Sequence, residues 1–329
     1  MSFQFPSTTI TFDAALRDIA SGSAKARARA AHALGGVTGE VEKRRAVDAL
    51  VRALDDDKPE VRAEACASLG ELREPAALPG LIKRLDDGIA AVRQNAAIAL
   101  GTIGHPDGFA PLLAALRDGP ADLRFQAATS LAEIDPAKAL APALAALDDK
   151  DGQVAGAAAL ALGAIGERDR ARVVAALTAK LSHGDAHVRF DVAYALAELR
   201  DPAGKAQLVA MIDDNERAWD AVTALGWLRA ADELRRAVLA KKMAQEPQVL
   251  AAGRLLAVEA DPHAQKLLLD ALTNRKVHVR GLAVEQLGEV GGAWAKGPLE
   301  RLARSGKGGE LLEALANALR AIAAREGGE

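Results

Sequence analysis

The chain has 329 residues, of which 50% are hydrophobic but only 3% aromatic, and alanine-rich runs occur along its whole length. Alanine is the strongest helix former, so this composition predicts an all-α fold packed on small side chains. The formal net charge of −3 at pH 7 provides no general attraction for nucleic acid or an anionic membrane surface. No stretch approaches 18 uninterrupted apolar residues, so we predict no membrane insertion.

The N-terminal stretch MSFQFPSTTITF lacks a cationic region followed by a continuous apolar segment, so it does not have the pattern of a signal peptide. Cys66 is the only cysteine, and no intramolecular disulfide can therefore form. We expect a cytoplasmic protein with residues 1–10 as an extended N-terminal arm. Residues 324–329 are expected to be a disordered C-terminal tail.

Between residues 11 and 323 the sequence repeats itself about every 31 residues. The repeat is most easily followed through one leucine of each unit, which we call the anchor leucine and define by Leu69 in ASLGEL. Equivalent residues indicate about ten units, which share one buried helical position: Leu34, Leu69, Leu100, Leu131, Leu162, Leu196, Leu225, Leu256, Leu287 and Leu319.

Each unit reads as two helices. The first helix often begins at an acidic residue followed by proline, as in Asp135-Pro136 and Asp261-Pro262, which is an N-cap followed by the first helical position. A turn rich in aspartate follows, and its carboxylates are placed to cap the second helix rather than to bind a metal or act in catalysis.

The second helix has the pattern V-R-x-x-A-x-x-A-L-G-x-[LI]. Its apolar residues, such as Val61, Ala65, Leu69 and Leu72, recur at spacings of three to four and form one buried stripe. Cys66 lies beside this stripe among small residues, so we interpret it as a packing residue rather than a nucleophile.

The motifs VRAEACASLGEL, VRQNAAIALGTI and VRFDVAYALAEL resemble the HEAT-repeat family, in the short bacterial form similar to phycobilisome-lyase-like repeats. The resemblance implies one right-handed α-solenoid of about ten helix pairs over residues 11–323, with the second helices lining a concave groove. It also implies a structural ladder of arginines that bond acidic turn residues between adjacent repeats. A phosphate-binding row is the alternative. The ladder arginines are Arg27, Arg62, Arg93, Arg124, Arg189 and Arg280.

No motif predicts catalysis. His183 and His187 are the only close histidine pair, but they lie in a turn with no further ligands nearby, so we predict no metal site. Neither a nucleophile elbow nor a glycine-rich phosphate loop is present, and we predict no catalytic residue and no cofactor. Lysines and arginines between residues 25 and 45 are interspersed with acids, which favours solvated helix faces over nucleic-acid binding.

The positions six and two before the anchor leucine and two after it vary freely and fall on one helical stripe outside the core. By the resemblance, this stripe lines the groove. Exposed aromatic residues there predict a binding site, although they could instead fill packing gaps. The predicted groove residues are Phe125, Phe190, Tyr194, Trp219 and Trp227, with Leu160 as a low floor and Glu133 and Glu198 at the rim.

We therefore predict a non-catalytic interaction scaffold or adaptor that binds a peptide segment or partner helix of some basic character. The alternative is a lyase or lyase-chaperone subunit that acts on a chromophore-bearing or otherwise modified protein. That alternative depends on the phycobilisome-lyase resemblance alone, since a fold does not determine a function.

Overall fold

The computed structural model describes residues 10–240, 243–305 and 308–326, and all regular structure in these ranges is helical. The helices alternate between a first and a second helix of each repeat. The first helices are α1 (Phe12–Ser21), α3 (Glu40–Ala53), α5 (Leu78–Arg84), α7 (Phe109–Asp118), α9 (Pro136–Ala146), α11 (Arg170–Lys180), α13 (Lys205–Ala210), α15 (Ala231–Leu239), α17 (Pro262–Ala271) and α19 (Ala293–Arg304). The second helices are α2 (Ala24–Gly35), α4 (Pro59–Leu72), α6 (Ala90–Ile103), α8 (Ala121–Ile134), α10 (Gly152–Ile165), α12 (Ala186–Glu198), α14 (Ala218–Trp227), α16 (Gln245–Leu256), α18 (Val277–Val290) and α20 (Leu312–Glu326).

The helix starts have the chemistry that the sequence predicts. Asp135 accepts hydrogen bonds from the backbone N–H groups of the second and third residues of α9, and Asp261 does the same at α17. In both cases proline occupies the first helical position, where its missing N–H costs no hydrogen bond.

The predicted capping by the turn aspartates is not seen at Asp87 and Asp149, because each accepts from the N–H two residues further along, at the residue that precedes α6 or α10. At α10 the cap is Asp151, which accepts from the N–H groups of Gln153 and Val154.

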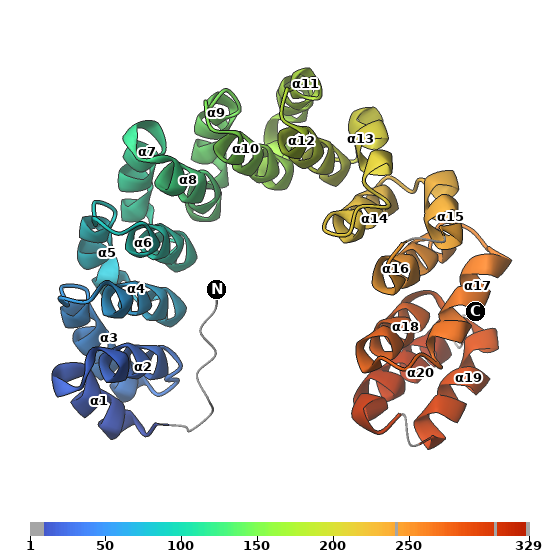
Figure 1. The fold of residues 1–329 in the computed structure, drawn as a ribbon, viewed down its shortest axis with the longest axis horizontal. Coiled ribbons are helices and arrows are strands. Elements are labelled where there is room, and N and C mark those ends of the chain that lie inside the picture. The colour runs from blue at the N-terminus through green and yellow to red at the C-terminus, as the bar shows by residue number, and fades with distance from the viewer. Residues whose placement is uncertain (1–9, 241–242, 306–307, 327–329) are drawn as a thin grey trace. The chain divides into compact units, whose positions relative to one another are not determined.

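The chain divides into two compact units, which we describe separately: residues 1–176 with 183–191, and residues 177–182 with 192–329. In the N-terminal unit, helices α2, α4, α6, α8 and α10 pack one on the next, and the first helices form a second layer outside them (Figure 1). In the C-terminal unit, α14, α16, α18 and α20 pack in the same succession. Sequential packing of helix pairs is the architecture of an α-solenoid, which confirms the predicted fold class.

The anchor leucines form the centre of the packed layer. Leu69, Leu162 and Leu225 are fully buried, as are most of their equivalents. Cys66 is fully buried too, and burial raises the pKa of its thiol to about 12, as expected of a packing residue.

The predicted anchor of the eighth repeat, Leu256, does not have the full burial of an anchor leucine. It is half-buried, whereas Leu255 is fully buried. In other repeats the glycine after the anchor lies against the residue before the next anchor, as Gly70 does with Ala99. Gly226 lies in the same way against Arg254, but Gly253 of α16 lies against Gln286, the residue before Leu287. The contacts of α16 with its two neighbours therefore do not define one anchor residue.

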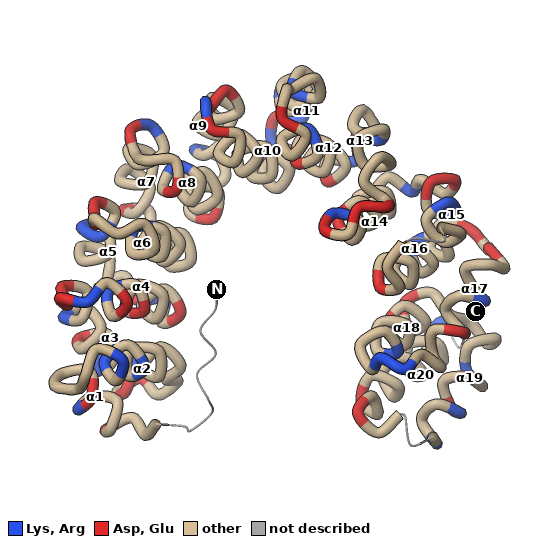
Figure 2. The backbone as a smooth tube through the Cα atoms, in the orientation of Figure 1, with Lys and Arg blue, Asp and Glu red and all other residues tan. Residues whose placement is uncertain are grey.

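Four of the predicted ladder arginines join one repeat to the next, at turns that are rich in acidic residues (Figure 2). Arg124 donates from Nε and Nη2 to both oxygens of Asp149, at 2.8 and 2.7 Å, and Arg93 donates from Nη2 to Asp122 at 2.8 Å. Arg27 pairs with Asp56, and Arg62 with Asp87, through two bonds each.

Each of the six arginines also donates to a carbonyl of the turn before its own helix. For Arg189 the acceptors are the carbonyls of His183 and Gly184, and for Arg280 they are those of Asn274 and Arg275. The row is therefore occupied by hydrogen bonds to the protein itself, which favours a structural role over phosphate binding.

At the chain ends, the predicted arm falls almost wholly on residues 1–9, which lie outside the described residues. Helix α20 continues to Glu326, so residues 324–326 belong to a helix and not to a disordered tail. Residues 327–329 lie outside the described part of the chain.

Candidate functional site

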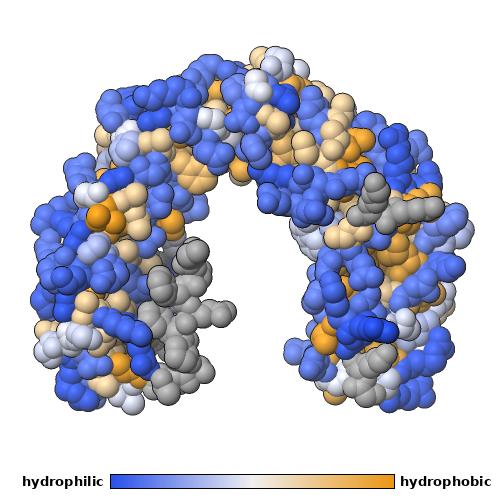
Figure 3. Space-filling view, viewed as in Figure 1, coloured by the Kyte–Doolittle hydropathy of each residue, from blue (hydrophilic) through white to orange (hydrophobic). Residues whose placement is uncertain are grey.

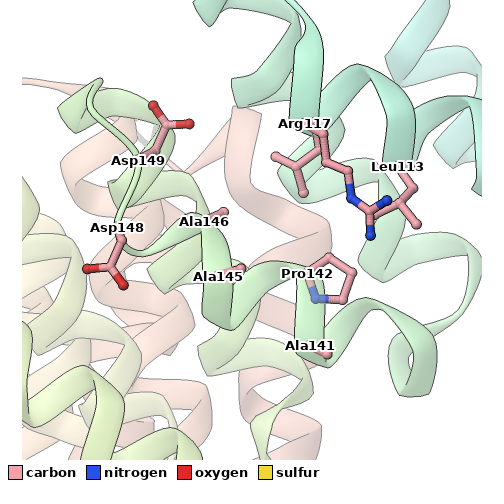
Figure 4. A pocket seen from close by; sticks show the side chains of 9 residues that line it. Leu113, Arg117, Ala141, Pro142, Ala145, Ala146, Asp148 and Asp149 are labelled. Carbon is pink, nitrogen blue, oxygen red and sulfur yellow. The ribbon is translucent and has the colours of Figure 1, made fainter.

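Four pockets in the described part of the chain lie away from the predicted groove residues. One of about 360 Å³ lies between α7 and α9, where Leu113, Arg117 and Pro142 line its walls (Figure 4). Similar pockets lie between α1 and α3, between α5 and α7, and between α16 and α17. Because the same notch recurs where neighbouring helices of the stack meet, we interpret it as a feature of the repeat and not as an active site.

The C-terminal unit holds an aromatic cluster on its second helices. The rings of Tyr194 on α12 and Trp227 on α14 lie 5.0 Å apart between centroids, with an interplanar angle of 67°. This edge-to-face arrangement is a favourable one for aromatic pairs. Trp219, two turns before Trp227 on α14, is 42% exposed. All three are predicted groove residues.

A cation already lies on this cluster. The guanidinium carbon of Arg200 is 5.7 Å from the centroid of the Trp227 ring, which is within the range of a cation–π interaction. Arg200 follows α12 in the left-handed region, with φ of 59°. Its N–H donates to the carbonyl of Ala197, and the N–H of Asp201 donates to that of Leu196. These two bonds form the Schellman motif that ends many helices.

Two carboxylates complete the charge pattern. Burial raises the pKa of the Tyr194 hydroxyl, and the negative charges of Asp220 and Glu198 raise it further. Burial also raises the pKa of Glu198, and Arg200 opposes that shift. The partly buried ring pair therefore lies in the electrostatic field of two acids and one arginine.

The N-terminal unit has its own apolar stripe on the second helices. Ile98 on α6 and Leu160 on α10 are exposed, Phe125 on α8 is half-buried, and apolar residues gather over α8 and α10 in the surface view (Figure 3). Glu133 lies over Gly101, where its Oε2 is 2.8 Å from the point that a Cβ would occupy. Burial raises the pKa of Glu133, against the opposing charge of Arg73.

The prediction of Phe190 as an exposed groove residue is wrong, because its side chain is only 3% exposed. The position six before the anchor leucine is not uniformly on the open face. Gly156 at this position is also buried, since Asp191 occupies the place of its missing Cβ.

Sequence analysis missed Arg200 and Asp220. A signal for Arg200 was present in the repeat frame: it stands four residues after the anchor leucine, where the third repeat has Gly104, also with positive φ. For Asp220 we find no sequence signal.

The described residues contain no group of His, Cys, Asp and Glu placed to hold a metal ion. Within the same residues, none of the helices is both long and apolar enough to cross a membrane. His183 accepts a hydrogen bond from the N–H of Asp185, which is a role in the turn.

Fold and site together define an α-solenoid repeat protein with an aromatic surface cluster. A family model described as HEAT repeats matches residues 14–91, 78–163 and 141–226. The chain therefore belongs to the HEAT-repeat family, and the predicted resemblance is confirmed. Proteins of such repeats generally bind other proteins on extended surfaces.

Several solved structures are similar to the chain. One is an engineered protein with 20% identity and a TM-score of 0.41, where the match covers 95% of this chain and 99% of the other. The complex of CpcE and CpcF of phycocyanin lyase from Nostoc sp. PCC7120 has 25% identity and a TM-score of 0.41, over 82% and 97%. Computationally designed armadillo repeat proteins for modular peptide recognition have 23% identity and a TM-score of 0.38, over 57% and 99%. No curated protein matches the sequence.

Proposed function

We propose that the chain is a non-catalytic scaffold that binds a peptide segment or a helix of another protein on its second helices. The observation that supports this most directly is the group of aromatic residues on α12 and α14: Tyr194 and Trp227 form a ring pair, and Trp219, two turns before Trp227, is 42% exposed. Tyrosine and tryptophan at exposed positions are enriched in the residues that dominate binding energy.

The charges around the cluster favour a partner with basic residues. Glu198 and Asp220 act on the Tyr194 hydroxyl, so a cation of the partner would meet two carboxylates beside an aromatic surface. The apolar stripe of Ile98, Phe125 and Leu160 gives the N-terminal unit a second surface suited to apolar side chains of a partner.

The proposal can be tested without knowledge of the natural partner. Peptides would be selected against the purified protein from a displayed random library, and their affinities measured by fluorescence anisotropy. We expect enrichment of peptides that combine basic and apolar residues. Tyr194→Ala and Trp219→Ala should each weaken binding on the order of 30-fold, which corresponds to about 2 kcal/mol for a hot-spot residue.

Leu239→Ala provides the matched control, because Leu239 is 53% exposed but lies on a first helix. It should leave the affinity unchanged. Equal affinities for all three variants would contradict the proposal, as would a large loss of thermal stability in Tyr194→Ala with binding retained in the folded fraction.

The lyase alternative stays a prediction, and no contact in the described residues favours it over the scaffold. Co-expression with a bilin-bearing substrate protein tests it, because a lyase subunit should increase the covalently attached chromophore measured by absorbance. A scaffold of the kind proposed here should leave that absorbance unchanged.

A further inference from the structure

We propose that the Tyr194–Trp227 pair is a receptor for one arginine side chain of the binding partner, and that Arg200 fills this receptor in the free protein. The inference rests on the proposed function, since it names the chemistry by which that surface recognises its partner. It also assigns a role to Arg200 that follows from the position of its side chain.

The first observation is the occupied ring face. The Arg200 guanidinium lies 5.7 Å from the centroid of Trp227, and the Tyr194 ring meets Trp227 at 67°. The Trp227 ring thus already has a guanidinium over its face, and the Tyr194 ring packs against the same indole. A planar guanidinium can stack on an aromatic ring in a way that an ammonium cannot, so the geometry favours arginine over lysine.

The second observation is the charge around the rings. Glu198, on the same helix as Tyr194, and Asp220, on the same helix as Trp227, both act on the Tyr194 hydroxyl. An incoming guanidinium would replace Arg200, whose charge already acts on Glu198, without adding a net positive charge to the site. Carboxylates are also the groups with which a guanidinium makes paired hydrogen bonds.

The third observation is that the backbone does not need an arginine at this position. The two hydrogen bonds that end α12 come from backbone atoms, and φ of 59° is a conformation that glycine adopts more readily. The side chain of Arg200 is exposed, so it can leave the ring without disturbing the core.

Arg229 is a matched control within the same unit. It follows α14 with φ of 52°, and the N–H groups of Arg229 and Ala230 make the same pair of bonds to Gly226 and Leu225. The ring contacts found among the described residues include none for Arg229. Arg200→Gly and Arg229→Gly therefore make the same backbone change, but only the first vacates the aromatic face.

The test uses the full chain labelled with ¹⁵N, in which Trp219, Trp227 and Trp294 give three indole N–H signals. Nα-acetyl-arginine amide is titrated into wild type, Arg200→Gly and Arg229→Gly, with the neutral citrulline amide as the isosteric probe. In Arg200→Gly we expect a saturable shift of the Trp227 signal, with a dissociation constant at least about threefold lower than in wild type. Arg229→Gly should behave as wild type, and citrulline amide should cause no saturable shift.

Equal dissociation constants for wild type and Arg200→Gly would overturn the proposal, and so would an equal response to citrulline amide. Nα-acetyl-lysine amide binding as tightly as the arginine probe would overturn the assignment to arginine. A further variant, Arg200→Gly with Trp227→Leu, should lose the shift at Tyr194, followed through its ring protons.

The probe titration and the peptide selection can fail independently of each other. If the arginine probe binds Arg200→Gly but no library peptide depends on Tyr194 or Trp219, the receptor stands and the scaffold function fails. If selected peptides depend on both residues but Arg200→Gly binds the probe no better than wild type, the scaffold stands and the receptor fails.

Discussion

Ionisation of two glutamates on the second helices destabilises the folded state. Glu133 and Glu198 both stand two residues after an anchor leucine, and burial raises the pKa of each carboxyl group even though an arginine opposes the shift. A carboxyl group whose folded pKa lies above its unfolded value, near 4.3, binds protons more tightly in the folded state. Stability therefore falls as the pH rises through the interval between the two pKa values.

Glu198→Gln should for this reason raise the melting temperature at pH 7, where the wild-type carboxylate is ionised. Near pH 4 the wild-type group is already largely protonated, so the difference should shrink. Scanning calorimetry at the two pH values measures both effects. Glu285→Gln, at an exposed position in the interior of α18 and away from both helix ends, serves as the control and should change neither value. A gain that is the same at pH 4 and pH 7 would show that the effect does not come from ionisation.

At the scale of the helices, the arginine ladder is uneven, and its members should differ in how much they stabilise the stack. Arg124 is 7% exposed and makes two bonds to Asp149, whereas Arg93 makes one bond to Asp122. Removing one partner of a buried ion pair costs more than removing a partly exposed hydrogen bond, because the remaining charge loses its partner away from water.

Arg124→Ala should thus lower the free energy of unfolding by about 3 kcal/mol, and Arg93→Ala by about 1 kcal/mol. Urea denaturation measures both. The bonds from Arg124 hold the pKa of Asp149 below its usual value. The contribution of this pair is therefore present above the unfolded pKa, near 3.9, and is lost as the pH falls through the folded pKa. If both variants lose the same free energy of unfolding, the prediction that the more buried arginine contributes more is wrong.

The repeat and its caps could be predicted from sequence because they depend on local chemistry. Asp135 and Asp261 cap the helices that follow them, and the anchor leucines recur at helical spacing. The burial of Phe190 could not be predicted, because position six before the anchor is open or buried according to side chains of other helices, as Asp191 shows by filling the place of the missing Cβ of Gly156. The contact of Arg200 with Trp227 was also beyond sequence, since it depends on the distance between two helices.

At the scale of the whole molecule, the boundary between the two compact units lies within helices and not in a linker. The chain leaves the N-terminal unit within α11, after Ala176, and again within α12, after Asp191. The prediction of one solenoid over residues 11–323 can therefore be examined at these two helices. Proteases cleave segments that can unfold locally, and a helix packed in a repeat stack resists this more than an exposed loop does.

Limited trypsin digestion should accordingly give no pair of stable fragments from a cut at Lys180 or Arg189, although both residues are sites for the enzyme and lie in these helices. The comparison variant has a flexible Gly-Ser segment with one lysine inserted after Gly184, which is exposed in the turn between α11 and α12. Trypsin should nick this variant at the insertion, which shows that the enzyme reaches the region when the backbone there is free. Mass spectrometry of the products separates the outcomes. Two stable fragments from the unmodified chain, divided between residues 176 and 192, would show that the chain has two domains and that the single solenoid is wrong.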